Sequence, residues 1–199
     1  MTAGFRFFDF SEHKIMKTYF CMAEEGIILS CRNTAQDFFM DKKTKILFIS
    51  STGGHLSELL QLSPMFGRCD FHIITEDNPS NLSLRDTYGK DRVAFVPYGS
   101  KSQPLTYAFH FSANIVKSLH YFRKWNPDVI ITTGTHTAVP MCRIAHLFKK
   151  KVIWIETVAN ATTPTMAGKM VYPIADLFIV QWKSMLEVYP NAVYGGFIF

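Results

Sequence analysis

The chain has 199 residues, of which 48% are hydrophobic and 19% are charged, and its formal net charge is +5. A chain of this length and hydrophobicity buries a core as one domain, which excludes a disordered or low-complexity protein. The positive charge suits an anionic partner such as a phosphate, a nucleic acid or an acidic membrane surface, without choosing among them.

Residues 1–39 differ in composition from the rest of the chain. They contain seven of the 18 Phe residues and no Pro, and they show no clear helical or strand period. Their four basic and five acidic side chains leave a net charge of +6 on residues 40–199. Two interpretations stay open: an N-terminal extension that docks on the domain or a membrane, or an upstream start codon with Met40 as the natural first residue. In both, residues 40–199 form the domain.

Short apolar runs alternate with longer amphipathic segments from Lys45 onward. The predicted strands span residues 45–50, 71–75, 92–97, 128–132, 151–155 and 176–180, and the predicted helices span 55–66, 105–125, 137–148, 163–172 and 182–189. The strands are almost continuously hydrophobic, as strands buried on both faces are. This alternation predicts an α/β fold, a Rossmann-like doubly wound parallel sheet with helices on both faces. Ligands of such folds bind at the carboxyl ends of the strands.

The loop after the first predicted strand contains Thr52, Gly53, Gly54 and His55. Paired glycines before a helix allow close backbone approach, and the first helical amides can then hold phosphate oxygens. His55 at the helix start can serve as a general base or as a polar anchor for a hydroxyl. A plain tight turn with a satisfied histidine is the alternative interpretation of these residues.

Two further strand ends carry polar residues. Thr133, Gly134, Thr135 and His136 follow the fourth predicted strand and form a second candidate anion cradle, although His136 could instead cap the next helix. Glu156 ends the fifth strand, and because an unpaired buried carboxylate is costly, it is either used in chemistry or engaged in a cap. We expect these residues to share one edge of the sheet.

The predicted helix at residues 105–125 mixes aromatic residues with Lys117, Arg123 and Lys124. Such a segment can lie on anionic lipid, but an amphipathic crossover helix with its apolar stripe in the core is the more common explanation. No stretch approaches the roughly 18 apolar residues of a membrane span, and no signal-peptide pattern is present.

The four cysteines are scattered through the chain without Cys-x-x-Cys spacing or a paired histidine: Cys21, Cys31, Cys69 and Cys142. They are therefore interpreted as thiols of a reducing compartment, and no metal site or disulfide framework is expected.

Several segments together resemble one family. They are KILFISSTGGHLSELLQL, PDVIITTGTHTAVP, KVIWIETVANATTPTMAGKMVYPIADLFIVQW and YPNAVYGGFIF, in order over about residues 44–199. The chain is similar to the accessory subunits of split glycosyltransferases of capsular and exopolysaccharide synthesis. It also resembles the membrane-anchoring subunit of the eukaryotic UDP-GlcNAc transferase that acts on dolichol-diphosphate-GlcNAc.

The resemblance implies the N-terminal half of a GT-B glycosyltransferase, which binds a polyprenyl-diphosphate-linked sugar acceptor without a cofactor. A separate catalytic chain would supply the UDP-sugar site, so this chain alone should be nearly inactive. His55 would be the first candidate for the base or acceptor-orienting group, with Glu156 second. The two glycine loops would hold the diphosphate or sugar. The family's eukaryotic members have a membrane span, and this sequence shows no comparable apolar stretch. Attachment here would therefore be peripheral, at the cytoplasmic face. No nucleic-acid partner is expected.

Two other classes of function remain as alternatives. A free-standing nucleotide-binding or oxidoreductase domain would carry a Gly-x-Gly-x-x-Gly fingerprint and an acidic ribose-binding residue. The fingerprint is missing, although Glu76 ends the second predicted strand. A purely structural scaffold that docks a transferase would leave His55 and Glu156 dispensable.

Overall fold

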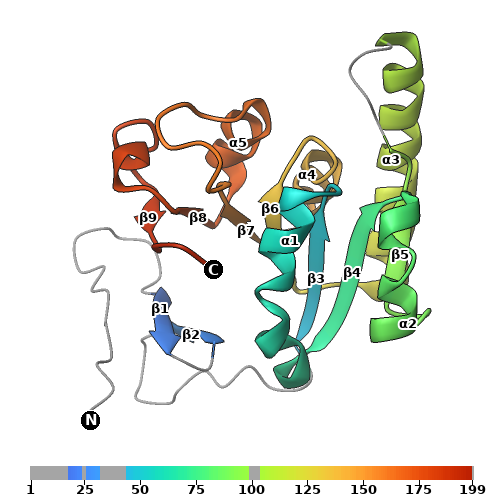
Figure 1. The fold of residues 1–199 in the computed structure, drawn as a ribbon, viewed down its shortest axis with the longest axis horizontal. Helices are drawn as coiled ribbons and strands as arrows, with labels where there is room; N and C mark the ends of the chain where they lie inside the picture. Colours follow the sequence, from blue (N-terminus) through green and yellow to red (C-terminus); the bar gives the residue numbers. More distant parts are fainter. Residues whose placement is uncertain (1–17, 24–25, 32–43, 99–103, 199) are drawn as a thin grey trace.

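The computed structural model describes the backbone of residues 18–23, 26–31, 44–98 and 104–198. Within these residues, seven strands form one parallel sheet (Figure 1), in the order β5-β4-β3-β6-β7-β8-β9. They are β3 (Lys45–Ser50), β4 (Asp70–Glu76), β5 (Val93–Val96), β6 (Val129–Gly134), β7 (Lys151–Ile155), β8 (Leu177–Val180) and β9 (Val193–Tyr194). A separate antiparallel pair is formed by β1 (Thr18–Ala23) and β2 (Gly26–Cys31).

The helices of the described residues connect the strands. The α-helices are α1 (Gly54–Leu60), α2 (Leu84–Tyr88), α3 (Pro104–Trp125), α4 (Val139–Leu147) and α5 (Met166–Val171). Short 3₁₀ turns are η1 (Ser63–Arg68), η2 (Pro79–Asn81), η3 (Tyr172–Ile174) and η4 (Lys183–Leu186). No helix of the described residues is both long enough and apolar enough to cross a membrane.

The predicted Rossmann-like parallel sheet is confirmed, and all six predicted strands are present to within two residues at each end. The helix predicted at 182–189 is wrong, because only the 3₁₀ turn η4 forms there. The helix predicted at 55–66 is two elements, since the chain leaves α1 at Leu60 and continues as η1 with Pro64 in its first turn. The predicted boundary between residues 39 and 40 lies outside the described residues.

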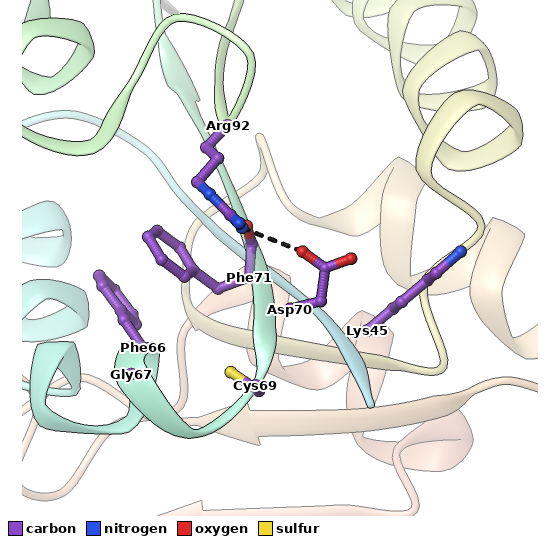
Figure 2. A pocket seen from close by; sticks show the side chains of 7 residues that line it. All are labelled: Lys45, Phe66, Gly67, Cys69, Asp70, Phe71 and Arg92. Carbon is purple, nitrogen blue, oxygen red and sulfur yellow. Dashed lines mark hydrogen bonds and ion pairs between the residues drawn. The ribbon is translucent and has the colours of Figure 1, made fainter. Parts of the chain in front are cut away.

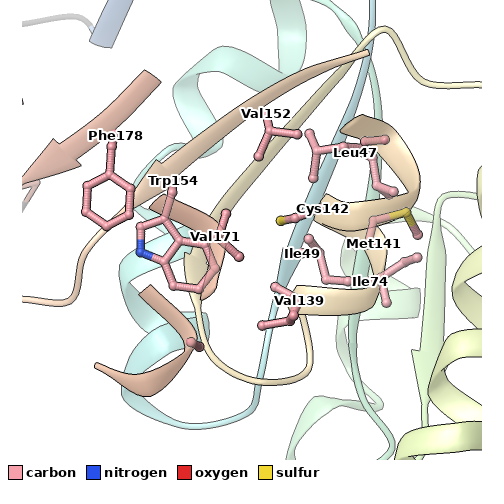
Figure 3. Close-up of a cluster of buried hydrophobic side chains, with 14 of the residues drawn as sticks. Leu47, Ile49, Ile74, Val139, Met141, Cys142, Val152, Trp154, Val171 and Phe178 are labelled. Carbon is pink, nitrogen blue, oxygen red and sulfur yellow. The ribbon is translucent and has the colours of Figure 1, made fainter. Parts of the chain in front are cut away.

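Two apolar clusters form the core, one on each face of the sheet. Because side chains alternate along a strand, Leu47 and Ile49 of β3 enter the first cluster, while Ile46 and Phe48 enter the second. Buried residues of α4 and α5 (Figure 3), together with those of α3, complete the first cluster. Those of α1, η1 and α2 complete the second. Strands covered on both faces explain the continuous apolar runs of the sequence.

The order of the strands determines where a ligand site can form. From β3 the chain moves outward through β4 and β5, and then α3 returns it to β6 on the other side of β3. The loops that follow β3 and β6 lead to helices on opposite faces of the sheet, since α1 packs in the second cluster and α4 in the first. Such a point, where the winding reverses, is where doubly wound sheets bind their ligands.

Candidate functional site

The loops after β3 and β6 contact each other directly at the carboxyl edge of the sheet. His55 Nδ1 lies 2.8 Å from the carbonyl oxygen of Thr133, and the Thr133 hydroxyl donates to the carbonyl oxygen of His55 at 2.6 Å. The amide of Ser51 donates to the carbonyl oxygen of Gly134 at 3.2 Å. The structure thus brings together residues that lie about 80 positions apart in the sequence. We call this contact the β3–β6 junction.

The junction determines which nitrogen of His55 is available for chemistry. A carbonyl oxygen only accepts hydrogen bonds, so Nδ1 is the protonated nitrogen of the neutral imidazole ring. Nε2 then carries the lone pair of the ring. A half-buried imidazole in this tautomer can accept a proton from a hydroxyl group, as a general base does.

The paired glycines leave open space beside the junction. Gly53 has a φ of 73°, a conformation that favours glycine, and it precedes α1 as the N-cap without any side-chain hydrogen bond to the first turn. A Cβ atom added at Gly53 or Gly54 would meet nothing within 4 Å. The backbone here is accessible to a ligand, with the first amides of α1 beside it.

The second glycine loop packs more tightly. A Cβ atom at Gly134 would lie 3.4 Å from the Trp154 ring and 3.5 Å from His55 Nδ1, and its φ of 100° also favours glycine. Thr135 and His136 follow at the same edge, both half-buried, with the Thr135 hydroxyl 3.3 Å from His136 Nδ1. The structure therefore places His55 in contact with Thr133 and beside Gly134. Thr135 and His136 lie at the same carboxyl edge of the sheet.

Glu76, at the end of β4, holds both glycine loops. Its carboxylate accepts a hydrogen bond from the Thr52 amide at 3.1 Å and another from the Thr137 hydroxyl at 2.6 Å, and its side chain is buried. The sequence placed Glu76 at a strand end but gave no sign of these partners. Both carboxylate oxygens are engaged by the protein's own loops, so Glu76 is a support of the site.

Glu58, one helical turn after His55, is another buried carboxyl group. Sequence reasoning did not single it out. Its Oε1 accepts hydrogen bonds from the Thr157 hydroxyl and the Val158 amide, both at 2.9 Å. Its Oε2 is buried and has no hydrogen-bond partner among the described residues. Burial raises the pKa of this carboxyl, against the opposing effect of the two hydrogen bonds. Glu58 thereby attaches the helix that carries His55 to the loop after β7.

The raised pKa of Glu58 predicts a pH-dependent effect of the isosteric substitution Glu58→Gln. The folded state binds this proton more tightly than the unfolded chain, so wild-type stability falls as the pH rises above about 4.5, the ordinary pKa of a glutamate. Glutamine keeps the Oε1 acceptor but does not titrate. The variant should therefore gain stability relative to the wild type as the pH rises, until the pKa of the folded state is passed.

Urea unfolding of both proteins at about pH 5, 6, 7 and 8 measures this difference. Glu187→Gln, which alters an exposed acid, is the matched control and should give a flat difference. A Glu58→Gln difference that is equally flat would show that Glu58 ionises in the folded protein as freely as in the unfolded chain.

Glu156 directly follows β7, and its buried side chain has both carboxylate oxygens engaged in hydrogen bonds. Oε2 accepts from the Trp154 indole nitrogen at 2.7 Å, and Oε1 accepts from the Thr165 amide at 2.9 Å. Thr165 in turn caps α5 by accepting from the Gly168 amide. These contacts favour a supporting role, in which Glu156 anchors the loop between β7 and α5. The catalytic role suggested by the resemblance stays a prediction.

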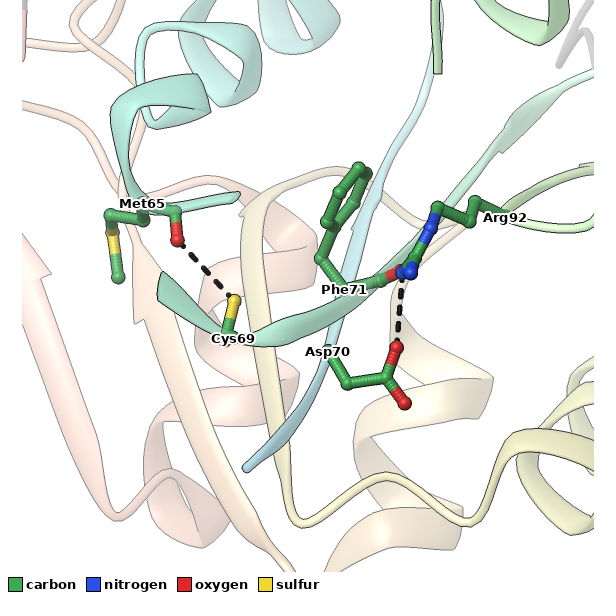
Figure 4. A network of polar contacts seen from close by, with 5 residues as sticks. All are labelled: Met65, Cys69, Asp70, Phe71 and Arg92. Atoms are coloured by element: carbon green, nitrogen blue, oxygen red, sulfur yellow. Dashed lines mark hydrogen bonds and ion pairs between the residues drawn. The ribbon is translucent and has the colours of Figure 1, made fainter. Parts of the chain in front are cut away.

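An open pocket of about 570 Å³ lies at the opposite, amino-terminal edge of the sheet (Figure 2). Arg92 donates to the Asp70 carboxylate at 3.0 Å and to the Phe71 carbonyl at 2.8 Å (Figure 4). Cys69 lines the same pocket, but burial raises the pKa of its thiol to about 11, which makes it a poor nucleophile. This edge contains none of the predicted site residues.

The sheet order and its switch-point loops define a class of protein, the Rossmann-like domains of GT-B type. Solved structures with this fold include MurG from Acinetobacter baumannii, with a TM-score of 0.58 at 16% identity over 71% of this chain. UDP-N-acetylglucosamine 2-epimerase from Rickettsia bellii gives a TM-score of 0.60 at 14% identity over 78% of the chain. The match covers 42% and 45% of those two proteins, so the chain spans less than half of each.

Within this class, the sequence identifies the family. Residues 45–198 match the family described as "Oligosaccharide biosynthesis protein Alg14 like", and the chain belongs to it. The chain is 25% identical over 175 residues to the human UDP-N-acetylglucosamine transferase subunit ALG14, covering 76% of this chain and 81% of that protein. The subunit of the same name from Yarrowia lipolytica is 32% identical over 178 residues, covering 77% and 81%.

Proposed function

We propose that this chain is the acceptor-binding half of a two-chain UDP-sugar glycosyltransferase. Its acceptor would be a sugar linked to a polyprenyl diphosphate, and a partner chain would bind the UDP-sugar. The observation that carries the proposal is the β3–β6 junction, which places an imidazole beside two glycine loops at the switch point of a GT-B-type sheet. The relatives support the two-chain arrangement, since each is named as a subunit of a UDP-N-acetylglucosamine transferase.

The proposed chemistry is an inverting transfer from the UDP-sugar. The acceptor hydroxyl loses its proton as its oxygen bonds to the anomeric carbon, while the bond from that carbon to the diphosphate oxygen breaks and UDP leaves. His55 Nε2 accepts that proton, because Nδ1 is held by the Thr133 carbonyl. Backbone amides and hydroxyls of the two loops bind the diphosphate or the sugar of the acceptor. The residues assigned to this cradle are Thr52, Gly53, Gly54, Thr133, Gly134, Thr135 and His136. No cofactor or metal is assigned to the reaction.

The proposal includes a cellular setting. A lipid-linked acceptor lies in a membrane, so the chain would act as a peripheral protein at the cytoplasmic face, and it would not bind nucleic acid. Family membership supports oligosaccharide biosynthesis in general. The relatives found are UDP-N-acetylglucosamine transferase subunits, which lend no support to the more specific capsular or exopolysaccharide setting.

Reconstitution with a partner tests the proposed function. The full chain is co-expressed with the product of a neighbouring reading frame that resembles a UDP-sugar-binding half. Transfer is then followed from radiolabelled UDP-GlcNAc to a water-soluble, short-prenyl diphosphate-linked GlcNAc. We expect a stable complex, transfer by the complex, and a loss of at least roughly 100-fold when either chain is omitted. Transfer by this chain alone would refute the two-chain proposal.

The same preparations distinguish the alternatives. Calorimetric titration of the chain with NAD should show no binding, whereas a dinucleotide-binding domain would bind it in the micromolar range typical of cofactors. A pure scaffold would support transfer by the complex regardless of substitutions at the β3–β6 junction.

A further inference from the structure

The helical layer formed by α3, α4 and α5 contains no acidic residue. Between residues 104 and 175 the sequence has only two, Asp128 and Glu156, against eight Lys and Arg. Asp128 pairs with Lys150 at 3.0 Å, and Glu156 is buried at the end of β7. The segment that carries the other helical layer, residues 54–91, has six acidic and three basic side chains. The positive charge of the domain is therefore concentrated on one of its two helical layers.

The outer side of this layer also exposes large apolar side chains. The exposed fractions are 73% for Phe109, 68% for Val116, 77% for Leu147 and 70% for Met166. The exposed basic residues of the same three helices are Lys117, Arg123, Lys124, Arg143 and Lys169. Of these, Lys117 on α3 donates to the carbonyl oxygen of Phe95 at 3.2 Å. On α3 the buried residues Asn114, Ser118, Phe122 and Trp125 face the sheet, so Val116 and Arg123 point outward.

Contacts between the helices make this layer one continuous surface. The Arg143 guanidinium on α4 donates to the carbonyl oxygen of Met170 on α5 at 3.3 Å. The rings of Phe122 on α3 and Phe148 just after α4 lie 5.2 Å apart. The first turns of α3 extend well past the carboxyl ends of the strands (Figure 1), on the side of the sheet edge where His55 lies. We call the outer side of α3, α4 and α5 the basic face.

We propose that the basic face binds an anionic lipid bilayer. Lysine and arginine side chains would meet lipid phosphates, while the exposed aliphatic and aromatic side chains enter the boundary between head groups and acyl chains. Charge complementarity selects this occupant, because a surface without a single carboxylate faces no repulsion from an anionic membrane. The large apolar side chains distinguish it from a nucleic-acid surface, which needs cations and hydrogen-bond donors rather than exposed aliphatic groups.

The biological role of this membrane binding rests on the proposed function. A basic face bound to the bilayer would bring the β3–β6 junction close to lipid-linked acceptors. Its physical content can be measured without any transfer reaction. Each basic residue near an anionic surface contributes to the attraction, and salt weakens that attraction.

Vesicle sedimentation of the full 199-residue chain tests the proposal. The probes are phosphatidylcholine vesicles with and without about 30% phosphatidylglycerol, at low and high NaCl. The charge-reversal variant is Arg123→Glu with Lys169→Glu. Its matched control is Arg68→Glu with Lys90→Glu, which makes the same change of net charge with two exposed residues outside the three helices. A third variant, Leu147→Ser, removes an exposed apolar group.

We expect binding only to the anionic vesicles, weakened by salt. The charge-reversal variant should bind at least roughly tenfold more weakly, the control within about twofold of the wild type, and Leu147→Ser detectably more weakly. Equal losses for both charge variants would overturn the proposal, as would absent vesicle binding by the wild type. Tighter binding to duplex DNA than to vesicles, lost in the same variant, would assign the face to nucleic acid instead.

Transfer assays keep the two proposals separable. With the short-prenyl, water-soluble acceptor, the charge-reversal variant in complex with its partner should keep the wild-type rate, because neither substituted residue belongs to the site. Transfer activity without vesicle binding would refute the membrane proposal alone. Vesicle binding without transfer would refute only the proposed function.

Discussion

A His55→Ala variant in complex with the catalytic partner is expected to transfer sugar about 10² to 10⁴ times more slowly than the wild type. The reason is the loss of Nε2 as proton acceptor, since Nδ1 is occupied by the Thr133 carbonyl at 2.8 Å. The loss should appear mainly in kcat, because proton transfer occurs in the transition state. Initial rates over a range of acceptor concentrations measure it.

His55→Asn separates chemistry from structure at the same position. The asparagine side chain can place its amide nitrogen near the position of Nδ1 and donate to the Thr133 carbonyl, so it preserves the junction while removing Nε2. We expect normal stability and partner binding with a rate as low as that of His55→Ala. His120→Ala, on the exposed surface of α3, is the control and should keep the wild-type rate. A His55→Asn complex with full activity would remove His55 from the mechanism.

Gly168→Ala is expected to lower the free energy of unfolding by about 2–3 kcal/mol, although it adds a single methyl group. A Cβ atom there would lie 2.5 Å from Glu156 Oε2, 2.7 Å from the Tyr189 hydroxyl and 2.8 Å from Thr165 Oγ1. All three distances are shorter than a real Cβ contact, so the carboxylate or the cap of α5 must move. Urea unfolding monitored by tryptophan fluorescence measures the change.

Gly67→Ala is the matched control, since a Cβ atom at Gly67 would meet nothing within 4 Å. It should leave stability within about 0.5 kcal/mol of the wild type. If Gly168→Ala is equally harmless, the loop between β7 and α5 is loose enough to accommodate the methyl group. The anchoring role of Glu156 would then have to be abandoned.

The sheet was predictable because its strands are short apolar runs, and such a run is visible within a few consecutive residues. The glycine loops followed from the strand ends, and the structure confirms that the loops after β3 and β6 meet at one edge. The roles of the buried carboxylates were not predictable in the same way. The partner of Glu76 on the β6–α4 loop is 61 residues away, and the hydroxyl that contacts Glu58 is 99 residues away.

The helix incorrectly predicted at 182–189 also fails because of contacts with residues distant in the sequence. Its apolar residues have a spacing compatible with a helix, but the segment is held by contacts with other parts of the chain. The Trp182 indole donates to the Val158 carbonyl at 2.7 Å, and the Ser184 hydroxyl donates to the Ala161 carbonyl. These bonds to the loop after β7 keep the segment as the 3₁₀ turn η4, which local sequence could not indicate.

The attachment of two glycine loops to the single carboxylate of Glu76 affects how a ligand can be recognised. Loops that are already ordered lose little conformational entropy when a ligand arrives, so the full strength of each new contact is retained. An acceptor would meet a surface with fixed geometry rather than one that closes around it. The large movement of a catalytic cycle would then lie between the two chains, and the association and separation of the subunits would replace the domain closure of a one-chain enzyme.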